Sequence, residues 1–219
     1  MEVFDRIPVL PDSAIIVERL RLGPGRAGPE GVDKLIGLAR SLVCPRAAVE
    51  AASVGARSEA TIEVAGITFE SPVLRKNLEK ADKAFPYVIT LGPDLERAAS
   101  AQADLLMQFY LEEIANVALE QAAGWLARRL EEVYGFRPLS SLSPGSLEDW
   151  PITEQTKLFS ILGDTQRLIG VRLTDSMLMV PRKSISGILF PSEEGFVACQ
   201  LCDRANCQGR KAPYKAKSG

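Results

Sequence analysis

LLMQFYLEEIANVALEQAAGWLARRLEEVY, residues 105–134, is the longest helical pattern in the chain, and Gly135 follows it directly. Apolar residues recur every three or four positions, which predicts an amphipathic helix with one face on a core. Gly135 suits the C-cap because glycine adopts the left-handed conformation without strain. The expected apolar stripe consists of Leu106, Phe109, Ile114, Val117, Ala118, Ala122, Leu126 and Leu130.

The segments around this helix predict short strands and further helices. Residues 58–71 alternate between apolar and polar side chains with Gly66 at a turn, which is typical of a hairpin. Residues 86–92 indicate a buried strand, and residues 153–162 a short helix with Thr153 as its N-cap. Because helices and hairpins alternate without a regular βαβ repeat, we expect an α+β fold. It would be a twisted, mostly antiparallel or mixed sheet packed with helices.

The segment after the long helix is a candidate ligand-binding loop. Residues 137–151 contain three prolines and a glycine, which predict irregular structure, and a loop of this length is usually functional or disordered. Arg137 opens the loop, and its guanidinium either caps the helix or holds a ligand carboxylate. The SPGS turn at residues 143–146 would bring backbone N–H groups close to a ligand, since Gly145 has no side chain to obstruct it.

Composition excludes several classes of function. The chain has 219 residues, a hydrophobic fraction of 46% and a net charge of −2, values of an ordinary globular protein without a general attraction to nucleic acid. No apolar run reaches the roughly 20 residues of a membrane span, and no secretory signal is visible. We therefore expect a cytoplasmic protein with neither nucleic acid nor membrane as a partner. Histidine is absent, which excludes histidine-based catalysis, so a bound cofactor is expected to supply the chemistry.

Three cysteines cluster near the C-terminus as CxxCxxxxC, namely Cys199, Cys202 and Cys207. Thiolates without histidine favour an iron–sulfur cluster or zinc, and cytosolic thiols stay reduced. Three ligands do not complete a tetrahedral site, so Cys44 is the candidate fourth ligand. The alternatives are a cluster with one open iron, a fourth ligand other than cysteine, or three incidental thiols.

Several segments in order resemble the reactivation domain of cobalamin-dependent methionine synthase. The tail cysteines and RKAPY (210–214) resemble its small free-standing relatives. The other matching segments are TLGPDLE (90–96), YLEEIANVALEQAA (110–123), GFRP (135–138), SPGSLEDWPITEQTKLF (143–159) and GVRLTDSMLMVPRKSISGILF (170–190). The resemblance implies one domain of that fold over residues 1–198. Its helical and hairpin part would occupy residues 1–100 and its ligand site residues 101–198, with a cysteine-rich basic tail at 199–219.

The resemblance also implies an activity. A partner's corrinoid would be reduced from Co(II) and methylated with S-adenosylmethionine, so the chain would be a component of a corrinoid-reactivating methyltransferase. The partner would be a corrinoid-binding protein or a methionine synthase core, with ferredoxin or flavodoxin as electron donor. The cysteines are a feature that the methionine synthase domain lacks, and our hypothesis is that they hold a 4Fe–4S cluster that relays electrons to the cobalt, or alternatively zinc. The competing hypotheses are an iron–sulfur relay or corrinoid reductase that does not use S-adenosylmethionine, and a non-catalytic docking module with a zinc-stabilised tail.

Site residues follow from the same resemblance. Arg137 would bind the methionine carboxylate, and Gly145 would let the backbone approach the ligand. Ser146 stands where the family usually has a tyrosine. Asn116 stands where methionine synthase has a ligand-binding glutamate, and Glu120 lies one turn further on the same helix face. All five residues are therefore candidates for binding S-adenosylmethionine.

Overall fold

A central antiparallel sheet organises the fold in the computed structural model, which describes residues 1–9, 11, 13–20, 29–136, 138–192, 195–204, 207 and 210–215. Within these residues eight strands form one sheet. Six of them follow the order β1-β2-β6-β3-β4-β5, and β10 pairs with both β6 and β7. The strands are β1 (Glu2–Asp5), β2 (Arg46–Val49), β3 (Ala52–Arg57), β4 (Thr61–Val64), β5 (Ile67–Glu70), β6 (Lys83–Thr90), β7 (Leu139–Leu142) and β10 (Ser184–Pro191). A separate small hairpin pairs β8 (Arg172–Leu173) with β9 (Met179–Val180). The predicted α+β class with a mostly antiparallel sheet is confirmed.

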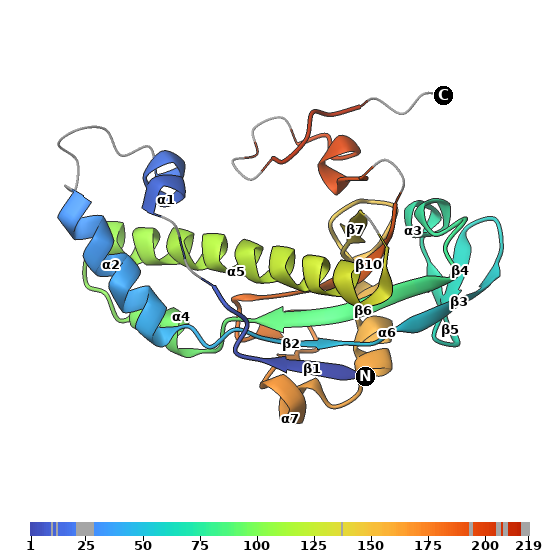
Figure 1. The fold of residues 1–219 in the computed structure, drawn as a ribbon, viewed down its shortest axis with the longest axis horizontal. Coiled ribbons are helices and arrows are strands. Elements are labelled where there is room, and N and C mark those ends of the chain that lie inside the picture. The colour runs from blue at the N-terminus through green and yellow to red at the C-terminus, as the bar shows by residue number, and fades with distance from the viewer. Residues whose placement is uncertain are drawn as a thin grey trace.

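Helices cover both faces of the sheet (Figure 1). On one face lie α1 (Ser13–Arg19), α2 (Pro29–Leu42), α4 (Asp94–Ser100) and α5 (Leu105–Tyr134). On the other face lie α6 (Gln155–Leu162) and α7 (Thr165–Ile169), while α3 (Pro72–Asn77) packs beside the β4–β5 hairpin. Strand β6 serves both layers because its side chains alternate: Phe85 and Ile89 join the α5 core, and Ala84 and Val88 join the opposite core.

Helix α5 matches its predicted bounds, and Gly135 ends it with φ +72° as expected. Six residues of the predicted stripe are buried. Leu106 and Phe109 are 50% and 48% exposed, so the prediction that these two side chains face a core was wrong. Figure 1 shows the reason: the N-terminal part of α5 extends past the sheet toward α2. Those first turns have no sheet beneath them to bury the stripe.

Two further predictions need correction. Residues 139–142 are strand β7 rather than irregular loop, because they pair with β10 in an antiparallel register. Thr153 is not an N-cap. A 3-10 turn (Ile152–Glu154) precedes α6, and no side chain makes the capping hydrogen bond there. Both differences depend on neighbours that are distant in the sequence or on the geometry of the preceding turn. By contrast, the β4–β5 hairpin and Gly66 at its turn, with φ +75°, are confirmed.

The tail leaves β10 and crosses to the α5 side of the molecule (Figure 1). It begins with an isolated parallel bridge between Val197 and Ser141, and a short 3-10 turn (Ala198–Gln200) follows. Lys211 then reaches α5, where its Nζ atom lies 3.9 Å from the Glu120 carboxylate. In the described residues, no helix combines the length and the hydropathy needed to cross a membrane.

Candidate functional site

A pocket of about 380 Å³ lies on α5 and contains two of the predicted site residues, Asn116 and Glu120. We call it the α5 pocket. The two side chains are four positions apart, which places them on one face of the helix. The remaining lining residues come from α1, β10, the tail and α5 itself: Arg19, Glu113, Leu119, Ala123, Ile185 and Lys211. The sequence did not indicate those from α1, β10 and the tail, because no motif links them to α5.

Glu120 is the charged centre of the α5 pocket. Arg19 donates to both of its carboxylate oxygens, Nη1 to Oε1 at 3.1 Å and Nη2 to Oε2 at 3.0 Å. The hydrogen bond to Glu120 raises the pKa of Arg19, against the opposing effect of its partial burial. Lys211 adds a second cation at 3.9 Å. Glu120 is still 37% exposed, so a ligand can approach its carboxylate from the pocket.

Asn116 is held by a polar network on the same helix face. Its Nδ2 atom donates to Glu113 Oε1 at 2.9 Å, and its Oδ1 atom accepts from Lys183 Nζ at 2.8 Å. Lys183 also forms an ion pair with Glu112 at 2.5 Å. The amide is therefore oriented by two charged neighbours before any ligand binds.

The composition of the α5 pocket suits a ligand with both charged and apolar parts. Glu113 and Glu120 can attract a cationic group, while Arg19 and Lys211 in the same lining balance their charge. An apolar wall of Leu119, Ala123 and Ile185 accommodates uncharged atoms of the same ligand. This combination suits a ligand that carries charged groups of both signs beside an apolar part.

The SPGS turn is shaped by its own contacts. The Gly145 N–H donates to the Trp150 carbonyl at 2.7 Å, and the Ser146 N–H to the Ser143 carbonyl at 3.1 Å. Gly145 has φ +76°, and a Cβ atom there would lie 2.9 Å from Ile152 Cδ1. The turn therefore requires glycine at position 145. Hydrogen bonds within the turn already occupy the N–H groups of Gly145 and Ser146, which we expected to face a ligand. Gly145 and Ser146 do not line the α5 pocket, and ligand binding by them stays a prediction.

Arg137 lies outside the described residues, so its predicted contact with a carboxylate is not visible. The segments on either side of it are fixed. Gly135 caps α5, and the Leu139 N–H donates to Glu131 Oε1 at 2.9 Å. Glu131 is thus engaged by the backbone of β7.

Backbone carbonyl groups of the three tail cysteines accept hydrogen bonds from one arginine. Arg210 donates to the carbonyl oxygens of Cys199 at 3.0 Å and Cys202 at 3.2 Å, and its N–H donates to the Cys207 carbonyl at 3.2 Å. Cys44 follows α2 and packs near Gly92 after β6, where its N–H donates to the Leu91 carbonyl. Within the described ranges, no three His, Cys, Asp or Glu side chains gather closely enough to hold a metal ion. The predicted iron–sulfur or zinc site, with Cys44 as fourth ligand, is not supported.

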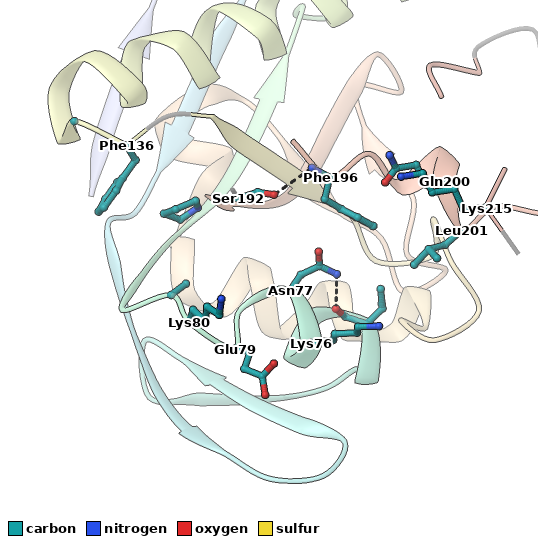
Figure 2. Close-up of a pocket in the computed structure, with 14 residues that line it drawn as sticks. Lys76, Asn77, Glu79, Lys80, Phe136, Ser192, Phe196, Gln200, Leu201 and Lys215 are labelled. Atoms are coloured by element: carbon teal, nitrogen blue, oxygen red, sulfur yellow. Dashed lines mark hydrogen bonds between the residues drawn. The ribbon is translucent and has the colours of Figure 1, made fainter. Parts of the chain in front are cut away.

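A larger pocket, which the sequence did not indicate, has a volume of about 710 Å³ (Figure 2). We call it the α3 pocket. It lies between α3 with the turn after it, the end of α5, the end of β10 and the tail. Phe136, the residue directly before Arg137, lines it, as do Gln200 and Leu201 between the first two tail cysteines.

Comparisons with known proteins show what this chain is similar to. The fold is similar to that in "Crystal Structure of the MetH Reactivation Domain bound to AdoHcy", with a TM-score of 0.61 and 18% identity over 90% of this chain and 81% of that chain. At this identity the likeness establishes the fold. Residues 134–207 match the family model "Vitamin B12 dependent methionine synthase, activation domain". The predicted resemblance to the reactivation domain is thus confirmed, whereas no curated protein matches the chain.

Proposed function

We propose that this chain reactivates a corrinoid cofactor held by a partner methyltransferase, with S-adenosylmethionine as the methyl donor. One electron from a low-potential donor would convert the partner's Co(II) to Co(I). The cobalt electron pair would then form a bond to the methyl carbon as the carbon–sulfur bond breaks, and S-adenosylhomocysteine would leave with the sulfur electron pair. The family match over residues 134–207 and the fold similarity to a domain bound to AdoHcy support this proposal.

The observation that carries the proposal is the meeting of Asn116 and Glu120 in the α5 pocket. S-adenosylmethionine has a sulfonium and an ammonium group, and both are attracted by a carboxylate such as Glu120. Asn116 supplies an amide already oriented by its neighbours. In this proposal Arg137 binds the ligand carboxylate, because a guanidinium pairs with a carboxylate through two parallel hydrogen bonds.

The tail has a positioning role in this proposal. Lys211 brings it to Glu120, while Arg210 holds the carbonyl oxygens of Cys199 and Cys202. The tail would cover one side of the α5 pocket and limit the access of water to the methyl group. The cysteines have no electron-transfer role in this proposal, because no metal-binding group of side chains is found among the described residues.

The partner in this proposal is a corrinoid-binding protein or the cobalamin-binding core of methionine synthase. Ferredoxin or flavodoxin, both low-potential carriers, would supply the electron. The chain's own contribution is to bind S-adenosylmethionine beside the partner's cobalt. The coupled methyl transfer makes the unfavourable reduction effectively irreversible because it consumes Co(I).

Calorimetric titration of the anaerobic protein with S-adenosylmethionine tests the proposal. We expect saturable binding that Glu120→Gln weakens by about tenfold, which corresponds to about 1.4 kcal/mol. Glu132→Gln is the matched control, because Glu132 is an exposed carboxylate of α5, paired with Arg129 and outside the pocket. Arg137→Ala should weaken binding by a similar factor. An intact protein that does not bind S-adenosylmethionine would overturn the proposal and favour the docking-module alternative.

A further inference from the structure

We propose that the α3 pocket binds a small aromatic phosphate. Its volume of about 710 Å³ falls within the range of roughly 300–1,000 Å³ typical of small-molecule sites. The α3 and α5 pockets share no lining residue among those described. This inference is therefore separate from the proposed binding of S-adenosylmethionine.

Two phenylalanine rings give the α3 pocket its apolar surface. Figure 2 shows Phe136 and Phe196 on opposite sides of Ser192. The Phe136 ring packs against Phe85 with centroids 6.2 Å apart, and the Phe196 ring against Phe190 at 6.5 Å. Since Phe85 and Phe190 are fully buried, core residues hold both rings in place. A flat ring in the ligand would find a preformed apolar wall at either end of the pocket.

The charged side chains around these rings are mostly cationic. Lys76, Lys80, Lys215 and Glu79 line the pocket, which gives their side chains a net charge of +2. Glu79 is already paired with Arg75 at 3.3 Å, and its carboxylate points away from Phe196 in Figure 2. In the described part of the chain, the ammonium groups of Lys76 and Lys215 have no ion-pair partner. Both side chains are exposed and free to reach a ligand.

This charge determines which anion fits best. A phosphate monoester carries a charge of about −1.5 to −2 at neutral pH, which matches the net charge of the lining. A carboxylate or sulfate ester carries only one negative charge and would leave part of the lysine charge uncompensated. Lysine binds phosphate as a point charge, so the exposed ammonium groups of Lys76 and Lys215 need no fixed geometry. Ser192 and Gln200 add polar side chains to the same wall.

A ligand-observed NMR titration with 1-naphthyl phosphate tests this inference. We expect saturable binding, with 1-naphthol, which lacks the phosphate, at least about tenfold weaker, and 1-naphthyl sulfate in between. The double variant Lys76→Gln/Lys215→Gln should bind 1-naphthyl phosphate about tenfold more weakly or worse. Lys34→Gln is the matched control, because Lys34 is an exposed lysine of α2 that lines neither pocket.

Three results would overturn the inference: no saturable binding, equal binding of 1-naphthol, or an equal loss in Lys34→Gln. S-adenosylmethionine titrations of the double variant separate the two sites. Its affinity for S-adenosylmethionine should stay within about a factor of two of the original protein. A naphthyl phosphate site that persists in a protein unable to bind S-adenosylmethionine would support this inference while contradicting the proposed function.

Discussion

Replacing Arg19 by glutamine should strengthen the binding of S-adenosylmethionine to the α5 pocket. In the unliganded protein, Arg19 occupies both carboxylate oxygens of Glu120. A ligand cation that approaches Glu120 must therefore compete with the guanidinium. Removing Arg19 leaves the carboxylate available and also removes a positive charge that repels a cationic ligand.

The magnitude follows from the exposure of the ion pair. The Arg19 and Glu120 side chains are 24% and 37% exposed, so solvent screens their attraction. A pair of this kind contributes about 0–1 kcal/mol. Releasing up to about 1 kcal/mol corresponds to an affinity gain of up to about fivefold. The gain should shrink at high salt, because the charges are partly exposed.

Calorimetric titration with S-adenosylmethionine of Arg19→Gln and of Arg129→Gln, each compared with the original protein, tests this prediction. Arg129 also belongs to an ion pair, with Glu132 at 3.7 Å, but it lies outside the α5 pocket, so its variant controls for net charge. Binding about tenfold weaker in Arg19→Gln would show that Arg19 holds the ligand carboxylate, and would refute the competition argument. An unchanged affinity would mean that the ligand cation does not approach Glu120.

Two further predictions concern stability around β10. Gly187→Ala should lower the free energy of unfolding by about 1–3 kcal/mol in a urea titration, because the new Cβ would press on the Leu142 carbonyl and lie 3.1 Å from Tyr87 Oη. Gly37→Ala, with nothing within 4 Å of its Cβ, is the control and should not destabilise the protein. Burial raises the pKa of Tyr87, outweighing its hydrogen bond to Ser141, so the native state keeps this proton after the unfolded chain has lost it. The free energy of unfolding should therefore fall above about pH 10, by up to about 1.4 kcal/mol per pH unit, and an equal fall in Tyr87→Phe would contradict this reasoning.

Local patterns were sufficient to predict the elements with strong periodicity. Helix α5 and its glycine cap follow from residues 105–135 alone, since three or more turns with one apolar face and a left-handed stop define a helix. The β4–β5 hairpin is similarly local. Strand β7 was missed because its pairing with β10 joins residues more than 40 positions apart. Prolines around it suggested a loop, whereas long-range pairing with β10 makes it a strand.

The candidate sites depend on tertiary structure to a greater degree. The sequence by itself identified Asn116 and Glu120, because helical spacing and a family resemblance placed them on one face. Only the fold brought Arg19 to Glu120, across 101 positions of sequence, and Lys211 to the same carboxylate. Similarly, the α3 pocket combines Lys76 with Phe196 and Lys215, which no local pattern connects. Periodicity describes a helix because its contacts are three or four residues apart, whereas a pocket is assembled from separate segments whose positions depend on how the whole chain packs.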